Sequence, residues 1–443
     1  MNFLRFFRKP RILTISLDGF PCSLFDCETV RLSMPFLSGL FKETPPRKME
    51  SVHPTVSPVA WASYLTGSHP IAHGIHGFLE RDLKRWEVFI PDARALLRET
   101  LWQILSCNTY TVFAMNVPMS YPPKPLRGIL VGDFLGLDLD RIAFPPRISE
   151  TLKSLDYMID ADTTSAARGD FAVFIDHLHH VVQRRRSAFL KLHTTLNWRL
   201  AHLHIMETDR LFHFLWDALV TDHPFSDAVF GLLRRIDDVI HEISGVLHPD
   251  DTLILMSDHG FCGIRSEIQM NAILEELGYL KWKSGTGTGL NRIDPASRAY
   301  SLIPGRVYLN MKGREPQGCV DSRHYSGMLS ELSDALRQFR IDPDETAVLS
   351  DVRITAGAEI APHPTAPDLI AIPRNGFDLK GKLEPSPMVS HSNLRGMHTF
   401  DDAFLWISNR KILKDAISIR DLFPSILNFF GIHDIESDGQ VIF

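Results

Sequence analysis

Short apolar runs alternate with longer segments of helical spacing along most of this chain. The apolar runs are bounded by turn residues, a pattern that predicts buried strands at residues 12–17, 110–117, 128–131, 200–206 and 252–256. Helices are predicted at residues 59–65, 148–155, 171–192, 208–218 and 225–246, with Arg184, Arg185 and Arg186 on an exposed helix end. Strands that alternate with helices form βαβ units, so the chain predicts an α/β fold with a mostly parallel sheet flanked by helices.

The pattern changes near residue 281. The glycine- and threonine-rich stretch at 283–289 is typical of a surface loop. Beyond it, residues 306–311 and 368–372 predict strands and residues 325–339 a helix. A strand at 403–408 and a helix at 419–430, closed by Gly431, then resume the first pattern. We therefore predict a catalytic core of residues 10–280 and 395–443, with an inserted α+β cap subdomain at 281–394.

Composition and charge narrow the class of protein. The chain has 443 residues, 44% of them hydrophobic, and can bury a large core. Its formal net charge is −6, from 47 basic and 53 acidic residues. This balance argues against a protein that coats nucleic acid, which usually presents a basic face. A small anionic substrate is still compatible with it, because a bound metal ion can dominate the local field.

Cysteine use and the N-terminal segment indicate the compartment. The five cysteines are far apart and form no C-x-x-C pair, which argues against a disulfide framework and a cysteine zinc site. The basic N-terminal segment lacks the apolar core of a secretory signal, and no run of 18 apolar residues occurs in the chain. We therefore predict a cytoplasmic protein without a transmembrane segment. The oligomeric state has no signature in the sequence.

Polar side chains follow the ends of the predicted strands. Asp18, Asp209 and the pair Asp258 and His259 come just after apolar runs. In parallel α/β sheets, ligands bind outside the carboxyl ends of the strands, so these side chains are expected at one edge of the sheet. His398 lies in a loop that leads into the strand at 403–408 and can cross the same edge.

The donor types predict the kind of metal. Asp209 and His213 are four residues apart on a predicted helix, so they share one face and can chelate one ion. The chain has 20 histidines, and this pair is informative only together with the other strand-end residues. Imidazole with carboxylate and without thiolate suits zinc, manganese or iron. We expect two divalent ions, zinc with manganese as a substitute.

Ser57 is the predicted nucleophile. A serine hydroxyl must be activated by a base or a metal, and no G-x-S-x-G elbow surrounds Ser57, which argues against a Ser-His-Asp hydrolase. A neighbouring metal ion would stabilise its deprotonated form. Ser57 also precedes Pro58 and can cap a helix that starts there, while a helix N-terminus favours a phosphate. Thr55 is a second candidate hydroxyl.

Several motifs extend over nearly the whole chain. They lie at residues 15–20, 57–67, 70–75, 116–123, 209–213, 257–261, 308–316, 366–369, 396–398 and 421–427. Together they resemble the type I phosphodiesterase/nucleotide pyrophosphatase family of the alkaline phosphatase superfamily. The resemblance is strongest to its prokaryotic branch of predicted phosphohydrolases and phosphomutases, and it implies an alkaline-phosphatase-like fold.

The resemblance also implies two metal-ligand sets. The first set is Asp209, His213 and His398, and the second is Asp18, Asp258, His259 and the Ser57 oxygen. Ser57 matches the family nucleophile, commonly a threonine, by its spacing to Trp61 and to the Thr66-Gly67 pair, which favours it over Thr55. The implied reaction proceeds through a phospho-serine intermediate on a small phosphorylated substrate.

The chain departs from the family pattern at a substrate-binding position. Many members carry an asparagine just after the H-G-I run; the matching residue here is Phe78, and Asn116 is the candidate replacement. The predicted function is phosphodiesterase or pyrophosphatase activity with two metals. A phosphomonoesterase or phosphomutase is the alternative, and an idle metal-binding module is a third. A monoesterase would need a basic residue near the phosphate, and the candidates are Lys281, Lys283, Arg292 and Arg298.

Overall fold

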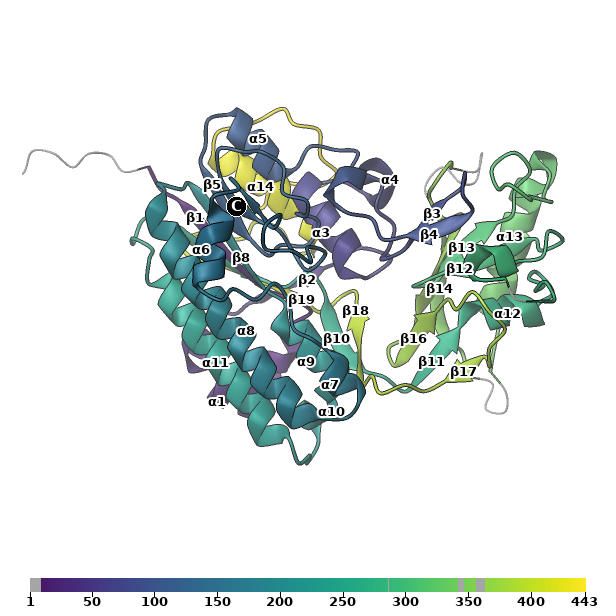
Figure 1. Cartoon of the computed structure of the whole chain (residues 1–443), viewed down its shortest axis with the longest axis horizontal. Helices are drawn as coiled ribbons and strands as arrows, with labels where there is room; N and C mark the ends of the chain where they lie inside the picture. The colour runs from purple at the N-terminus through teal and green to yellow at the C-terminus, as the bar shows by residue number, and fades with distance from the viewer. Residues whose placement is uncertain (1–8, 286, 342–345, 356–362) are drawn as a thin grey trace, which may run out of the picture.

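The predicted apolar runs form the strands of one central sheet. This computed structural model describes residues 9–285, 287–341, 346–355 and 363–443. Within those ranges the central sheet has the strand order β20-β2-β19-β9-β1-β8-β5-β6-β7 (Figure 1). Its middle is parallel, with β1 (Ile12–Leu17) between β8 (Leu200–Ile205) and β9 (Thr252–Met256). The other strands are β2 (Arg47–Glu50), β5 (Val112–Met115), β6 (Gly128–Val131), β7 (Ala143–Phe144), β19 (Ala403–Ile407) and β20 (Ile417–Ser418).

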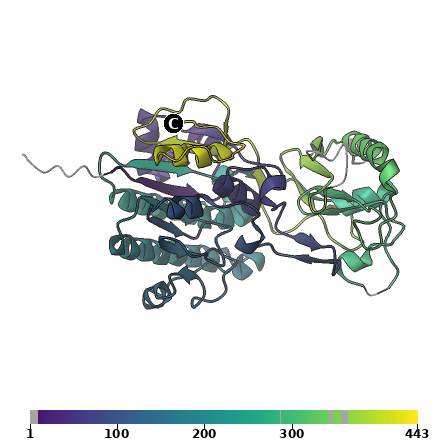
Figure 2. The same ribbon diagram turned by 90° about the horizontal axis from the view of Figure 1, so that it is seen from above.

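Helices cover both faces of this sheet, as Figure 2 shows from above. Every residue of β1, β8 and β9 is therefore buried, which explains their continuous apolar character. One hydrophobic cluster joins the sheet to α1 (Glu28–Ser33), α2 (Pro35–Glu43), α6 (Ile148–Ser154), α8 (Phe171–Leu192), α9 (Glu207–Leu215), α10 (Asp217–Val220) and α11 (Ser226–Ser244). The other face packs on α3 (Ser57–Thr66), α5 (Leu101–Cys107) and α14 (Leu422–Phe429). The predicted α/β fold is confirmed.

Two details of the helices differ from the expectation. The single helix expected at residues 208–218 is two helices, α9 and α10, with a break at Trp216. The Trp216 ring packs on Phe212 and Phe261, at centroid distances of 5.7 and 5.9 Å. Arg185 of α8 was expected on an exposed end but is buried. Its guanidinium donates to Glu207 Oε1 at 2.6 Å, and this ion pair offsets the desolvation of the charge.

A second part of the chain packs around its own hydrophobic cluster. Its sheets have the orders β12-β13-β15-β14 and β16-β11-β17. The elements are β11 (Ser266–Gln269), α12 (Met270–Glu276), β12 (Ala299–Leu302), β13 (Arg306–Leu309), α13 (Tyr325–Gln338), β14 (Leu349–Ile354), β15 (Leu369–Pro373), β16 (Phe377–Lys380) and β17 (Val389–Ser390). The boundary between core and cap at residue 281 stays a prediction. The strand β11 and the helix α12 come before residue 281 in the sequence, yet they pack with the second part.

A hairpin from the first part of the sequence also reaches this second part. It consists of β3 (Glu80–Asp82) and β4 (Glu87–Phe89), and Trp86 at its turn belongs to the second part's cluster. The Arg81 guanidinium is buried there, where it bonds Tyr300 and Glu315 and lies 3.8 Å from the Tyr308 ring centroid. The hairpin thus ties the two parts together.

Helix length and composition bear on whether the chain can span a bilayer. No helix within the described residues is both long and apolar enough to cross a membrane. Residues 1–8, which make up most of the basic N-terminal segment, lie outside the described ranges.

Candidate active site

Three neighbouring strands end at one edge of the sheet, and an aspartate follows each of them. Asp18 comes directly after β1, Asp209 lies in the first turn of α9 after β8, and Asp258 comes two residues after β9. Their exposed fractions are only 1%, 3% and 0%. Gly19 turns the chain after β1 with a φ of 65°, and a Cβ there would lie 2.9 Å from the rings of His259 and Phe261. The fold therefore gathers three carboxylates in one buried volume.

The first group of side chains surrounds Asp18. His259 Nε2 lies 3.4 Å from Asp18 Oδ1 and 3.4 Å from Asp258 Oδ2. The Ser57 Oγ lies 3.4 Å from Asp18 Oδ1 and 3.3 Å from His259 Nε2. The Gly19 amide donates to Asp258 Oδ1 at 3.1 Å, which orients that carboxylate. Residues from three separated segments thus meet around one point.

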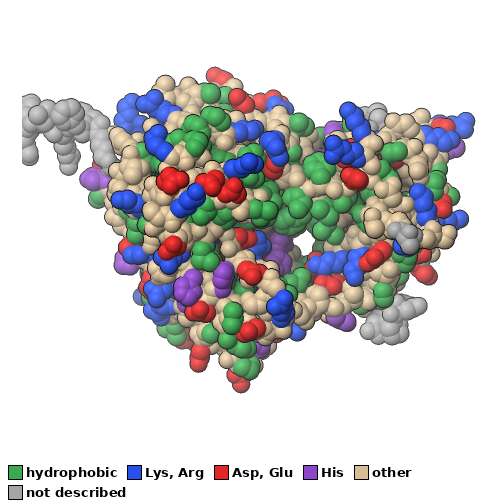
Figure 3. Space-filling view, viewed as in Figure 1, with side chains coloured by type: hydrophobic (Ala, Val, Ile, Leu, Met, Phe, Trp, Pro, Cys, Tyr) green, Lys and Arg blue, Asp and Glu red, His purple; other side chains and the backbone are tan. Residues whose placement is uncertain are grey.

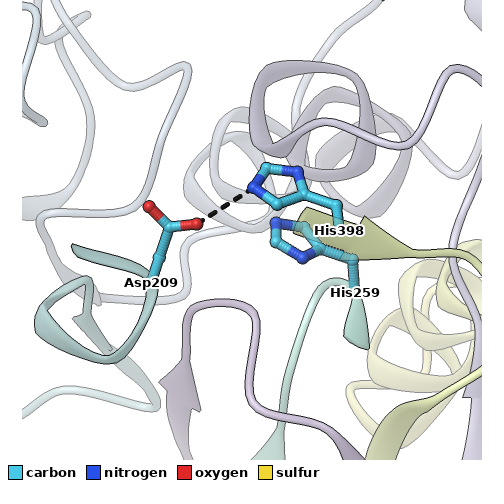
Figure 4. A group of neighbouring side chains, drawn as sticks. All are labelled: Asp209, His259 and His398. Carbon is cyan, nitrogen blue, oxygen red and sulfur yellow. Dashed lines mark hydrogen bonds and ion pairs between the residues drawn. The ribbon is translucent and has the colours of Figure 1, made fainter. Parts of the chain in front are cut away.

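The second group surrounds Asp209. His398 lies on β18 (Gly396–Thr399), which pairs with β10 (Gly260–Gly263) and so crosses the sheet edge. Its Nε2 is 3.1 Å from Asp209 Oδ1 and 3.0 Å from His213 Nε2. His213 Nε2 is itself 3.3 Å from Asp209 Oδ1. Figure 4 shows how the two groups adjoin, because the rings of His259 and His398 stack with centroids 3.8 Å apart beside Asp209.

Main-chain carbonyls set the tautomers of the three site histidines. The Nδ1 atoms of His213, His259 and His398 lie 3.0, 3.1 and 3.2 Å from carbonyl oxygens of Gly396, Gly260 and Thr55. A carbonyl only accepts, so each Nδ1 carries a hydrogen, and Nε2 is the ring atom left to bind a proton or a metal ion. The three Nε2 atoms face the carboxylates, which is the orientation that metal-ligating histidines require.

Crowding and burial shift the pKa values of these groups. Burial and the charge of Asp18 raise the pKa of Asp258 to about 8. Burial alone would lower the pKa of His259, yet Asp258 and Asp18 raise it to about 10. Burial and the neighbouring His259 lower the pKa of His398 to about 4. Despite its burial, Asp209 has a pKa well below the usual range because His213 and His398 lie beside it.

The donor arrangement fits divalent metal ions. Among the described residues, ligand atoms of Asp18, Asp258 and His259 lie within 4.8 Å of one another, and so do those of Asp209, His259 and His398. Asp258 Oδ2 is buried and has no hydrogen-bond partner within the described part of the chain. Such an orphaned carboxylate oxygen is satisfied by a cation. His259 belongs to both groups, whereas the sequence motifs assigned it to one.

The Ser57 hydroxyl does not serve as a helix cap. Ser57 is the first residue of α3, and Val56 occupies the capping position. This corrects the expected cap, because Pro58 lies at the second helical position and not the first. The hydroxyl instead points to Asp18 and His259, at the helix end that favours negative charge. The rival Thr55 hydroxyl donates to the Val52 carbonyl oxygen at 2.9 Å.

A cavity of about 640 Å³ opens beside the two groups. The core lines it with His53, Phe78, His213, His398 and Phe400, among other residues. The second part contributes β14, β15 and β16, with the basic residues Arg353, Arg374 and Lys380. Figure 3 shows the surface hollowed between the two parts, with histidine side chains at the hollow.

The four basic residues expected near a phosphate do not line this cavity. Lys281, Lys283, Arg292 and Arg298 are absent from its walls as the described residues define them. The Arg298 guanidinium lies over the Tyr279 ring, 4.3 Å from its centroid, and Lys283 Nζ donates to Gln317.

The sequence of the chain matches a known protein family over most of its length. A family model described as "Type I phosphodiesterase / nucleotide pyrophosphatase" matches residues 12–401. The chain belongs to this family. It is therefore a phosphoester hydrolase of the phosphodiesterase type, and its family is metal-dependent. A sequence comparison with curated proteins finds no match.

Solved structures of this fold are similar over nearly the whole chain. Phosphonoacetate hydrolase from Sinorhizobium meliloti 1021, in complex with phosphonoformate, has 16% identity and a TM-score of 0.61, covering 96% of this chain and 95% of its own. Murine ectonucleotide pyrophosphatase/phosphodiesterase 5 has 14% identity and a TM-score of 0.55, covering 97% of both chains. Its inactive variant in complex with AMP has 14% identity, a TM-score of 0.56 and the same coverage. At such low sequence identities, the similarity to these structures establishes a shared fold and nothing further.

The two residues expected to bind substrate lie in different places. Phe78, at the family's asparagine position, lines the cavity. Asn116 lies buried just after β5 with a φ of 65°, and its Oδ1 accepts from the Tyr157 hydroxyl at 3.4 Å. Within the described ranges no hydrogen bond joins Asn116 to the seven predicted site residues. Asn116 also does not line the cavity as the described residues define it, and its role in substrate binding stays a prediction.

Three residues that contact the site were not predicted. His204 Nε2 lies 2.9 Å from Asp18 Oδ2, and the Thr208 hydroxyl donates to the Asp18 carbonyl at 2.6 Å. Arg210 donates to Asp209 Oδ2 at 3.2 Å and to Asp160 at 2.7 Å. One signal was available: His202 and His204 are polar residues inside an otherwise apolar buried strand, where a polar group must find a partner.

Proposed function

We propose that this protein hydrolyses small phosphodiesters or pyrophosphates through nucleophilic attack by Ser57. The observation that supports this most strongly is the position of the Ser57 hydroxyl. It is free of capping, sits at the N-terminus of α3 and lies 3.4 Å from Asp18 and 3.3 Å from His259. Family membership supplies the hydrolase class, and the geometry supplies the candidate nucleophile.

Each of the two predicted ligand sets would hold one metal ion beside the reacting phosphorus. Asp18, Asp258 and His259 would hold one divalent ion, and Asp209, His213 and His398 the other, with zinc preferred and manganese as a substitute. When bound, such ions lower the pKa of a coordinated hydroxyl and neutralise charge on the phosphoryl oxygens.

The chain's own residues then position and attack the substrate. The Ser57 hydroxyl would give its proton to water while its Oγ attacks phosphorus in line. As the phospho-serine bond forms, the bond from phosphorus to the leaving-group oxygen breaks, its electron pair stays on that oxygen, and the oxygen takes a proton from water. The N-terminus of α3 favours the negative charge of the phosphoryl group. Water next hydrolyses the phospho-serine, which restores the Ser57 hydroxyl and releases the phosphate product.

The cavity supports a sizeable leaving group. A volume of about 640 Å³ lies in the range of small-molecule sites, and its walls combine apolar residues with Arg353, Arg374 and Lys380. Arg353 and Lys380 pair there with the wall residues Asp351 and Asp378. One structural neighbour of this chain was solved in complex with AMP. We infer that the cavity can hold a nucleotide-sized leaving group. The formal net charge of −6 argues against a basic surface that coats nucleic acid.

A phosphomonoesterase or phosphomutase is the second candidate. Arg210, beside Asp209, is the kind of basic residue that a dianionic phosphate needs. Its guanidinium is already bonded to Asp209 and Asp160, which favours the diester. An idle metal-binding module fits least, because all seven predicted site residues are present and adjoin. The cytoplasm stays the predicted compartment, consistent with five free cysteines.

Hydrolysis of a bis-aryl phosphate, compared with the matching aryl monophosphate, tests the proposal. We expect the zinc-loaded protein to prefer the diester and to lose activity with a chelator or the Ser57→Ala substitution. Ser68→Ala is the matched control, because its hydroxyl bonds Thr66 and lies outside the site. Preference for the monoester would favour a phosphatase or mutase. Activity that survives Ser57→Ala would overturn the nucleophile.

A further inference from the structure

A chain of buried polar side chains runs from Asp18 into the core. Asp18 Oδ2 is 2.9 Å from His204 Nε2, and His204 Nδ1 is 2.9 Å from the Ser16 hydroxyl. The same hydroxyl is 2.9 Å from His202 Nε2, and His202 Nδ1 is 3.3 Å from the Tyr64 hydroxyl. Each of these side chains is 0% or 1% exposed. Such a continuous polar path in a buried sheet needs an explanation beyond packing.

Strand register builds this path. Ser16 of β1 lies opposite His204 of β8, and Thr14 lies opposite His202, so the hydroxyl and both imidazoles project from one face of the sheet. Helix α3 covers that face. The Trp61 ring meets His204 at a centroid distance of 4.8 Å, and Tyr64 reaches His202. The helix that begins with Ser57 therefore also closes the far end of the path.

Hydrogen-bond chemistry fixes the donor at the Asp18 end of the path. An ionised Asp18 only accepts, so His204 Nε2 donates to it, and His204 Nδ1 is left to bond the Ser16 hydroxyl. The Ser16 hydroxyl also bonds His202 Nε2 and lies 3.5 Å from the Leu203 carbonyl oxygen, and His202 Nδ1 bonds the Tyr64 hydroxyl. The path therefore links the Asp18 carboxylate through His204 to buried groups on β1, β8 and α3.

We propose that Tyr64, His202, Ser16 and His204 form a hydrogen-bond relay that positions Asp18 as a metal ligand. His204 is the positioning residue: it engages Oδ2 and leaves Oδ1 toward Ser57 and His259. Hydrogen bonds in series polarise one another, so the relay strengthens the last donor. The inference rests on the proposed function in one respect, because it takes Asp18 as a ligand.

Two substitutions of His204 separate positioning from packing. His204→Gln places an amide donor near the original Nε2 and keeps the bond to Asp18. His204→Asn places its amide near the original Nδ1 and keeps only the bond to Ser16. Loss of a residue that orients a metal ligand typically lowers metal affinity about 10–100-fold. We expect that loss for one of the two ions in His204→Asn, and near wild-type affinity in His204→Gln.

Calorimetric titration of Zn²⁺ alone into the chelator-treated full chain measures both affinities without a substrate. Bound zinc per chain after dialysis gives the stoichiometry. Tyr64→Phe, at the far end, should cause a smaller loss than Ser16→Ala, which interrupts the relay beside His204. A merely structural role would lower the unfolding temperature of all these variants and leave their zinc affinities equal.

Several outcomes would overturn the relay. These are wild-type affinity in His204→Asn, equal impairment in His204→Gln and His204→Asn, or a wild-type protein that binds no zinc. If His204→Asn does not fold, Ser16→Ala decides, and unchanged affinity in that variant rejects the proposal. A wild-type protein that binds two ions but cleaves no diester would contradict the proposed function only, since the relay is judged on metal affinity.

Discussion

At the scale of single residues, the site depends on which atom of each side chain is already engaged. Thr55 and Ser57 are two residues apart and carry the same functional group. Thr55 donates to a main-chain carbonyl, whereas the Ser57 hydroxyl faces a carboxylate and an imidazole. The hydrogen-bond partner, and not the residue type, therefore distinguishes the proposed nucleophile from its neighbour.

The Ser57→Thr substitution tests this selection. Threonine keeps the hydroxyl on the same Cβ, so we expect diester hydrolysis to persist. Ser57→Ala should lower kcat by at least about a thousandfold, as loss of a nucleophile does elsewhere. Steady-state kinetics of both variants on the bis-aryl phosphate measure the difference. An inactive, correctly folded Ser57→Thr would show that the added methyl group clashes in the site.

A second residue-scale prediction concerns His73 in α4 (Pro70–His73). Its Nδ1 accepts from the Ile75 amide at 3.2 Å and its Nε2 donates to Ser63 at 2.9 Å, so the ring is neutral. Burial lowers its pKa to about 3, while the unfolded chain titrates near 6.5. The unfolded state thus binds more protons between these values, and stability should fall as the pH drops from 6.5 toward 3.

Denaturant unfolding at several pH values checks this expectation. His73 can contribute up to about 1.4 kcal/mol per pH unit to the slope of the unfolding free energy. His73→Asn keeps an acceptor for the Ile75 amide but has no imidazole to titrate, so its slope should be shallower in this window. Identical slopes in the two proteins would mean that His73 does not contribute.

At the scale of elements, a buried ion pair connects α8 to α9, the helix that carries Asp209 and His213. Arg185 of α8 bonds Glu207 at the start of α9, two residues before Asp209. Both side chains are buried. A buried ion pair stabilises the folded state little compared with an apolar pair of similar size. A buried charge that has lost its partner, however, strongly destabilises the folded state.

The Arg185→Met substitution should therefore lower the free energy of unfolding by about 3–5 kcal/mol, since it strands the Glu207 carboxylate. The double variant with Glu207→Leu should recover most of that loss. Chemical denaturation of the single and double variants measures the coupling between the two sites. A single variant as stable as the parent would indicate that Glu207 becomes protonated or hydrated without penalty.

At the scale of the whole molecule, two parts meet over the site. The β3–β4 hairpin passes from the core into the second part's cluster, and the cavity has walls from both. Asp18, Asp209 and Asp258 belong to the core, whereas the basic cavity residues come from the second part. The candidate catalytic residues thus come from one part of the chain, and the cavity walls come from both.

Metal removal should destabilise this whole assembly. A ligand that binds only the folded state adds RT ln(1 + [L]/Kd), about 2.7 kcal/mol at a hundredfold excess over Kd. We therefore expect chelation to lower the unfolding temperature and zinc to restore it. Asp258→Asn should respond less to zinc, because it removes one buried ligand charge. Scanning calorimetry with and without chelator is the measurement, and an unchanged transition would argue against tightly bound ions.

The amino-acid pattern is enough to predict the elements and the side chains available at the sheet edge. Apolar runs predict buried strands because burial on both faces demands continuous apolar residues, and β1 and β9 match those runs. Aspartates after such runs are expected to meet, because parallel strands end together. This reasoning concerns local pattern and topology, and it needs no knowledge of side-chain contacts.

The partners of those side chains could not be predicted from that pattern, because they depend on the folded chain. The burial of Arg185, the sharing of His259 between two groups and the bond from His204 to Asp18 join segments separated by 22 or more positions. The placement of the β3–β4 hairpin in the second part is likewise a long-range contact. Such contacts depend on strand register and on which polar atoms are already bonded. Neither quantity is encoded in local periodicity, so only the folded chain resolves them.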